Sequence, residues 1–254
     1  MVVNGDPVVW HELECGSYTA DLALWRELAT AASAVQGTPG AVLDVGAGTG
    51  RVTLELACRG HAVTALDLDE RLLAALRQRA VKLSVSTVET VCADARAFTL
   101  ERRQFSLCIV PMQTIQLLGG SSGRRAFFER ARAHLAPGGV LACAIVTDVE
   151  PFDCAAGDPG PIPEQTRVGG VSYLSRPTAL HLTGDALRIE RERSIVESGS
   201  TQGARLEHDV IELARVSVDR LHREGLAAGL TPAPPRTIAA TFEHTASTAV
   251  IFHG

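Results

Sequence analysis

Three glycines, Gly46, Gly48 and Gly50, stand at alternate positions directly after a short apolar run, residues 41–45. The run is interrupted only by Asp44, and it predicts a buried parallel strand that leads through a turn into a helix. Glycine lets a backbone approach a ligand closely, and the N-terminus of a helix presents unpaired N–H groups. This combination of strand, glycine turn and helix indicates a site for a nucleoside-bearing ligand.

The spacing of the glycines separates two kinds of nucleoside site. A dinucleotide-binding turn has the pattern Gly-x-Gly-x-x-Gly, which would require glycine at position 51, where the chain has Arg51. Gly-x-Gly-x-Gly after an acidic strand residue instead resembles the first motif of class I S-adenosylmethionine-dependent methyltransferases. The resemblance implies that S-adenosylmethionine is the cofactor and that its binding loop consists of Asp44, Gly46, Ala47, Gly48, Gly50 and Arg51.

Two members of this loop have alternative roles. A carboxylate buried in a strand must be hydrogen-bonded, so Asp44 could belong to a structural network with the loop instead of the ligand site. Arg51 could meet the cofactor carboxylate, and the equal alternative is a solvated surface arginine.

Two further acidic residues follow later apolar runs. Asp67 comes after residues 62–66, and an acidic residue about 20 positions past the glycines can accept both hydroxyls of a ribose. Leu68 would then offer an apolar face to adenine. Asp94 and Ala95 follow the run 87–92, and the resemblance implies that they contact the adenine amino group and a ring nitrogen. Each aspartate has an ordinary alternative, as a helix cap or a turn residue, although Asp69 stands at a better N-cap position than Asp67.

The end of the fourth expected strand, residues 105–110, bears on the methyl acceptor. Methyltransferases acting on nucleic-acid amino groups often have Asn/Asp-Pro-Pro-aromatic here, whereas this chain has Pro111-Met112-Gln113-Thr114. This departure favours a small-molecule acceptor. Gln113 and Thr114 could face the substrate or simply begin the next helix. We expect Tyr18, in a segment that could fold over the cofactor, and Gln113 to line the catalytic site.

No general base can be chosen from the sequence. The candidates for acid–base chemistry are His11, Tyr18, Asp148 and His181, and the last is more simply a satisfied histidine of a sheet. The remaining histidines lack the spacing of metal ligands, so no metal is expected.

Composition limits the class of protein. The chain has 254 residues, of which 46% are apolar, and a net charge of −5 without a basic cluster. Nucleic-acid binders usually present a basic face, so nucleic acid is an unexpected partner. The longest apolar run, 140–146, is too short to span a bilayer, and the N-terminus lacks the pattern of a secretory signal. Six cysteines without CxxC spacing suit a reducing cytoplasm, and a homo-oligomer is compatible with the sequence.

The elements around these residues alternate between strand and helix. Residues 8–35 predict one or two helices, which form a lid or cap within residues 1–37. Regular alternation to residue 146 predicts a doubly wound parallel sheet, and the last two strands, 237–240 and 247–252, predict a hairpin. The resemblance spans 1–150 and 216–254 and implies a Rossmann-like, seven-stranded α/β sheet with one antiparallel strand.

Residues 151–215 have a different pattern. After a turn-rich stretch, 151–163, apolar and polar residues alternate with the period of an antiparallel sheet. We interpret this segment as an inserted β cap over the active site. The insertion also resembles, more weakly, that of small-molecule methyltransferases related to the glycine and sarcosine enzymes.

Two other functions are compatible with parts of the sequence. A nicotinamide-dependent reductase would also bind a nucleoside, but Arg51 and the absence of a Tyr-x-x-x-Lys pair oppose it. A binding module or scaffold subunit could keep the nucleoside pocket without turnover. The retained acidic residues, Asp67 and Asp94, argue for cofactor binding but do not distinguish these possibilities from an enzyme.

Overall fold

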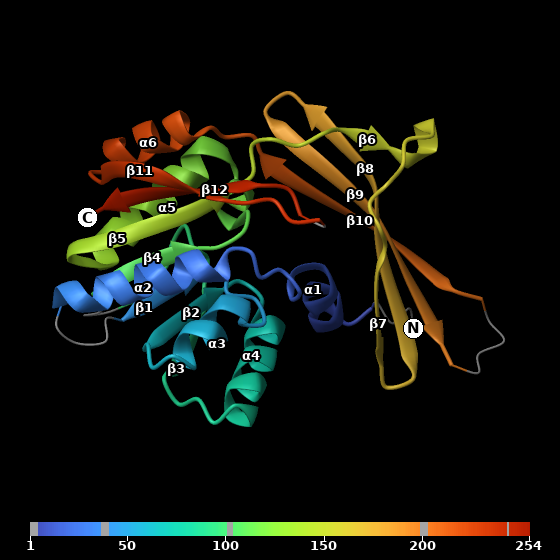
Figure 1. The fold of residues 1–254 in the computed structure, drawn as a ribbon, viewed down its shortest axis with the longest axis horizontal. Coiled ribbons are helices and arrows are strands. Elements are labelled where there is room, and N and C mark those ends of the chain that lie inside the picture. Colours follow the sequence, from blue (N-terminus) through green and yellow to red (C-terminus); the bar gives the residue numbers. More distant parts are fainter. Residues whose placement is uncertain (1–4, 37–40, 101–103, 199–202, 243) are drawn as a thin grey trace. The chain divides into compact units, whose positions relative to one another are not determined.

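A computed structural model describes residues 5–36, 41–100, 104–198, 203–242 and 244–254. The chain divides into two compact units (Figure 1). The first consists of Thr19–Asp148 and Val216–Gly254, and we call it the parallel-sheet unit. The second consists of Met1–Tyr18 and Val149–Arg215, and we call it the antiparallel-sheet unit.

Within its described residues, the parallel-sheet unit contains a seven-stranded sheet in the order β11-β12-β5-β4-β1-β2-β3. The strands are β1 Val42–Val45, β2 Val63–Asp67, β3 Val88–Cys92, β4 Phe105–Val110, β5 Leu135–Ile145, β11 Thr231–Ile238 and β12 Ser247–His253. Strands β1 to β5 pair in parallel, and β12 runs antiparallel to both of its neighbours. The predicted Rossmann-like sheet with one reversed strand is therefore confirmed.

Helices cover both faces of this sheet. They are α2 Leu22–Gln36, α3 Arg51–Ala57, α4 Glu70–Lys82, α5 Gly120–His134 and α6 Val218–Ala227, with a short 3-10 helix, η1, at Thr114–Leu117. On one face, α5 and α6 bury phenylalanines and leucines against alternate residues of β1, β4, β5 and β12. On the other face, α3 and α4 pack on Ala65 of β2. Asp69 caps α4 as predicted, and Leu83 at the other end of the helix is exposed.

Two strand boundaries differ from the sequence prediction. Strand β5 begins at Leu135 instead of residue 140, because Leu135 pairs with Phe105 across an irregularity in the register. Strand β11 begins at Thr231 instead of residue 237 and includes three prolines, Pro232, Pro234 and Pro235. Proline lacks the N–H of a sheet ladder, so it argues against a central strand but is tolerated at an edge or a bulge. Strand β11 is the edge of the sheet, and its register with β12 shifts between Ala233 and Arg236.

The antiparallel-sheet unit has its own sheet, in the order β10-β9-β8-β6, with β7 paired to β8. Its elements are α1 Pro7–Cys15, β6 Phe152–Asp153, a 3-10 turn η2 at Cys154–Ala156, β7 Glu164–Val168, β8 Val171–Thr183, β9 Ala186–Glu197 and β10 Arg205–Ala214. Strand β8 is continuous although it contains Pro177, because its pairing with β9 resumes at Ala179 after a shift in register.

Two observations bear on expectations from composition. Among the described residues, no helix combines the length and the apolar character needed to cross a bilayer. Cys108 and Cys143 are buried in the sheet, whereas Cys58 and Cys92 are exposed.

Candidate cofactor site

The predicted cofactor residues follow the carboxyl ends of β1, β2, β3 and β4. These four strands are parallel, so their carboxyl ends lie at one edge of the sheet. Strand β1 pairs with both β2 and β4, and the chain order of the sheet reverses between β1 and β4. Ligands of open α/β sheets bind outside the carboxyl ends of the strands at such a reversal.

The glycine loop after β1 has a backbone that side chains would not permit. Gly46, Gly48 and Gly50 have φ angles of 73°, 54° and 91°, in the left-handed region. A Cβ atom at Gly46 would lie 2.5 Å from the side chain of Thr114, and one at Gly50 would lie 2.1 Å from Leu76 Cδ1. Backbone geometry therefore favours glycine at all three positions, and close neighbours add to this requirement at Gly46 and Gly50.

Asp67 ties the glycine loop to the turn after β2. Its Oδ2 accepts a hydrogen bond from the Gly48 N–H (2.8 Å), and its Oδ1 accepts one from the Asp69 N–H (2.9 Å). Each carboxylate oxygen can accept a further hydrogen bond. The two backbone contacts fix the orientation of the carboxylate while leaving acceptor capacity for ribose hydroxyls. Leu68, the next residue, is 71% exposed.

Asp44 is a buried carboxylate with one unsatisfied oxygen. Its Oδ2 accepts from the Thr53 hydroxyl (2.6 Å), and its Oδ1 has no hydrogen-bond partner among the described residues. Burial raises the pKa of Asp44 to about 6, against the lowering effects of the Thr53 hydrogen bond and the Arg51 charge. An orphaned buried acceptor beside the loop fits a cofactor that carries hydrogen-bond donors and positive charge.

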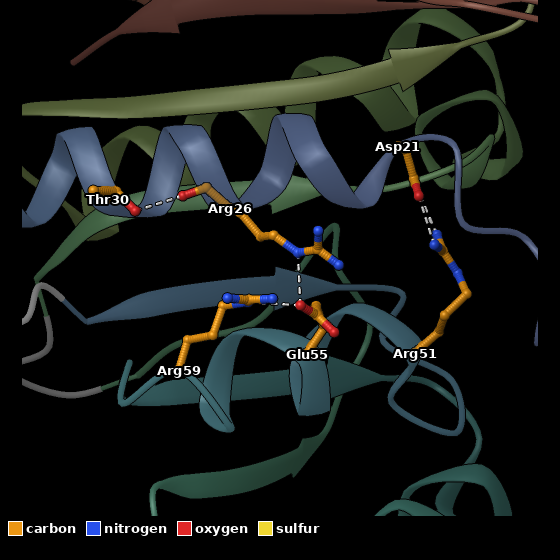
Figure 2. A network of polar contacts seen from close by, with 6 residues as sticks. All are labelled: Asp21, Arg26, Thr30, Arg51, Glu55 and Arg59. Carbon is orange, nitrogen blue, oxygen red and sulfur yellow. Dashed lines mark hydrogen bonds and ion pairs between the residues drawn. The ribbon is translucent and has the colours of Figure 1, made fainter.

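Arg51 is held by a buried partner that the sequence analysis did not identify. Its NH1 and NH2 donate to Oδ1 and Oδ2 of Asp21, at 2.6 and 2.8 Å (Figure 2). The Arg51 side chain is 10% exposed and that of Asp21 is 1% exposed. The alternative of a solvated surface arginine is therefore wrong.

Asp94 has a neighbouring partner as well. The Arg96 guanidinium binds both of its oxygens, with the shortest contact at 2.6 Å, and the Arg96 N–H donates to Oδ1. The hydrogen bond from Arg96 lowers the pKa of Asp94, so this carboxyl stays ionised. Ala95 between them is buried. The predicted adenine contacts of Asp94 and Ala95 stay predictions.

The segment after β4 combines an unusual backbone with a firm anchor. Pro111 is buried, and Met112 has a φ of 54°, which is rare for a side-chain-bearing residue. Gln116 donates to the carbonyl and accepts from the N–H of Val146, just past β5. Backbone strain of the kind found at Met112 concentrates at ligand sites. Gln113 caps η1 through its backbone, which agrees with its helix-starting role and leaves its substrate role a prediction.

The other predicted acid–base candidates are dispersed. Tyr18 is buried and, like His11 and His181, belongs to the antiparallel-sheet unit. Asp148 is exposed in the parallel-sheet unit, where its carbonyl accepts from the Thr245 hydroxyl. Nothing in these contacts selects a general base.

A comparison with protein families matches this same part of the chain. The family model described as a methyltransferase domain covers residues 42–139, which include the glycine loop, Asp67 and Asp94. Residues 42–139 are therefore similar to methyltransferase domains.

Solved structures resemble the whole chain at low sequence identity. An amino pentose methyltransferase from Micromonospora echinaspora is 21% identical, with 99% of each chain covered and a TM-score of 0.69. A sugar N-methyltransferase from a Streptoalloteichus species is 18% identical, with coverage of 98% of this chain and 96% of that chain and a TM-score of 0.73. An S-adenosylmethionine-dependent methyltransferase from Clostridium acetobutylicum is 13% identical, with 96% of each chain covered and a TM-score of 0.69. These likenesses show a shared fold.

Two partners of the predicted site residues could not be identified by the sequence reasoning above. Arg96 stands two residues after Asp94, and an acidic and a basic residue so close in a turn are a signal that could have been used. Asp21 and Arg51 are separated by 30 positions, and nothing in either local pattern indicates the pairing.

Proposed function

We propose that this chain transfers a methyl group from S-adenosylmethionine to a nitrogen, an oxygen or a carbon atom of a small-molecule metabolite. The observation that carries the proposal is the Asp67 carboxylate, oriented by two backbone N–H groups at the carboxyl end of β2. The acidic net charge and the Pro111-Met112-Gln113 sequence after β4 support a metabolite over a nucleic acid. The amino pentose and sugar methyltransferases that share the fold support the same choice.

The residues that would hold the cofactor have complementary chemistry. The glycine loop of Gly46, Ala47, Gly48 and Gly50 gives close backbone approach, and Asp67 gives acceptors for ribose hydroxyls. The unsatisfied Asp44 Oδ1 gives a further acceptor, and negative charge when ionised. Asp94 and Ala95 would contact the adenine, as the family resemblance implies, and Leu68 would offer it an apolar face. Pro111 would also contribute to the cofactor site.

When bound, S-adenosylmethionine supplies a methyl group already activated by a positive sulfonium. The chain therefore has to orient the acceptor in line with that methyl group and exclude water from it. A neutral amine needs no base before the transfer, whereas a phenol or an ammonium group requires a proton acceptor within hydrogen-bond reach. Tyr18 and Gln113 as lining residues, and residues 151–215 as a cap, stay predictions of the sequence.

Ligand binding tests the cofactor assignment directly. In calorimetric titrations, S-adenosylhomocysteine is expected to bind and NADH to give no response. Binding of NADH alone would overturn the proposal in favour of a reductase. If S-adenosylhomocysteine binds, incubation of a metabolite panel with labelled methyl donor is expected to give a methylated product. The absence of labelled product from amines, hydroxyl compounds and carbon acids would favour a scaffold.

Asp67→Ala is expected to weaken binding of S-adenosylhomocysteine by roughly 1–3 kcal/mol, because hydrogen bonds to ribose are lost. The same substitution removes the acceptor of the Gly48 N–H, which adds disorder to the loop. Titration calorimetry of the folded variant measures the effect.

Asp69→Ala is the matched control for Asp67→Ala. Asp69 lies in the same turn, but its carboxylate caps α4 and pairs with Arg71. Its loss is expected to reduce stability and to leave affinity nearly unchanged. Equal dissociation constants for the wild type and Asp67→Ala would remove Asp67 from the site.

A further inference from the structure

The carboxylate of Asp21 is a buried junction that receives three N–H donors. Arg51 contributes two of them, and Trp25 contributes its indole Nε1–H at 2.8 Å from Oδ2. Asp21 and Trp25 are 1% and 0% exposed. Both carboxylate oxygens are thus engaged, and the planar guanidinium meets them in a two-pronged arrangement that fixes its orientation.

The junction connects the start of α2 to the end of the glycine loop. Asp21 immediately precedes α2, and Trp25 lies one turn further along the chain. Arg51 is the first residue of α3 and follows Gly50, whose φ of 91° makes the turn into the helix. The position of the Arg51 side chain therefore constrains the backbone of the residue that closes the loop.

The charges around the loop show why the Arg51 guanidinium matters there. Asp44 is buried within the electrostatic influence of Arg51, Asp67 and Asp21, so three carboxylates share the neighbourhood of one arginine. Removing one partner of a buried ion pair leaves the other charge uncompensated. Loss of either Asp21 or Arg51 would thus disturb the loop beyond the loss of one contact.

We propose that Asp21 and Arg51 form a positioning pair that holds the glycine loop in its cofactor-binding conformation. Arg51 then acts through the loop backbone and is not the residue that binds the cofactor carboxylate. The proposal rests on the assignment of S-adenosylmethionine as the cofactor. It adds Asp21, which lies outside the loop motif, to the residues that determine cofactor affinity.

A second ion pair between the same two helices gives a matched control. Glu55, one turn after Arg51 in α3, binds Arg26 of α2 at 2.6 Å and Arg59 at 2.7 Å (Figure 2). The Glu55 side chain is 24% exposed, and Glu55 is one helical turn further from the glycine loop in the sequence than Arg51. Glu55→Gln therefore tests whether any loss of pairing between α2 and α3 has the same effect.

The experiment compares two ligands that differ in one part. S-adenosylhomocysteine and 5′-methylthioadenosine share adenosine and a thioether, but the second lacks the amino-acid carboxylate. Three variants test the pair: Asp21→Asn, Arg51→Gln and Arg51→Lys. Each is expected to weaken the binding of both ligands by a similar factor, about tenfold, because a small displacement of the glycine loop is costly. Arg51→Lys keeps the charge but lacks the two-pronged geometry. The double variant Asp21→Asn/Arg51→Gln is expected to bind the ligands no more weakly than either single variant. Each single substitution already removes the same interaction, so the effects should not add.

Each contrary result is distinct. If Arg51→Gln weakened S-adenosylhomocysteine but not 5′-methylthioadenosine, Arg51 would be a direct ligand of the carboxylate. If the variants lost thermal stability but kept both affinities, or if Glu55→Gln weakened binding equally, the pair would serve only to join helices. Any one of these three results would overturn the positioning role. Failure of the wild-type protein to bind either ligand would instead overturn the proposed function.

Discussion

Gly50→Ala is expected to lower the free energy of unfolding by about 2–5 kcal/mol. A left-handed backbone at a non-glycine residue costs about 1–2 kcal/mol, and overpacking of a tight core adds about 1–3 kcal/mol. The overpacking arises because the new Cβ would lie 2.1 Å from Cδ1 of Leu76, a fully buried side chain of α4. Denaturant unfolding measures the loss, and titration with S-adenosylhomocysteine is expected to show weaker binding.

Gly60→Ala separates the two causes. Gly60 has a φ of 90°, almost that of Gly50, but a Cβ there would meet nothing within 4 Å. Its substitution is expected to cost only the backbone part, about 1–2 kcal/mol, and to leave cofactor affinity unchanged. Equal losses of stability in the two variants would contradict the role of the Leu76 contact.

The buried carboxyl of Asp44 is expected to make stability depend on pH. Its pKa is about 6 in the folded protein, above the ordinary value of 3.8, mainly because burial disfavours the ionised form. Between about pH 4 and pH 6 the folded state therefore binds more protons than the unfolded state. The contribution of Asp44 to stability falls as pH rises through this window, by on the order of 3 kcal/mol in total.

Asp44→Asn is expected to remove this pH dependence, as measured by denaturant unfolding at intervals from pH 4 to pH 8 and compared with the wild type. Thr53→Val provides the second variant, because the Thr53 hydroxyl stabilises the ionised form. Its loss is expected to raise the folded-state pKa of Asp44 and so to extend the window to higher pH. Identical pH profiles for the wild type and Asp44→Asn would show that Asp44 titrates alike in both states.

The glycine loop and its surroundings could be predicted because their determinants are local. The three glycines, the apolar run before them and the cap at Asp69 are each recognisable within a few residues. The seven-stranded sheet with one antiparallel strand followed from the family resemblance and is confirmed. Local patterns are thus sufficient to predict that the candidate cofactor residues lie at one edge of the sheet.

The features that could not be predicted depend on distant parts of the chain. The partner of Arg51 is Asp21, and its choice depends on how α2 packs beside α3. The beginning of β5 depends on pairing of Leu135 with Phe105, not on apolar periodicity. The positive φ of Met112 has no signature in residue type, since methionine rarely adopts it.

The prolines of β11 have a consequence for the protein in concentrated solution. An edge strand normally presents a row of N–H and C=O groups on which another chain can build. Pro232, Pro234 and Pro235 carry no N–H, and the bulge between Ala233 and Arg236 bends the strand out of regular register. Strand β11 is therefore a poor template for the addition of a strand from another molecule. This property disfavours aggregation through the β11 edge of the sheet.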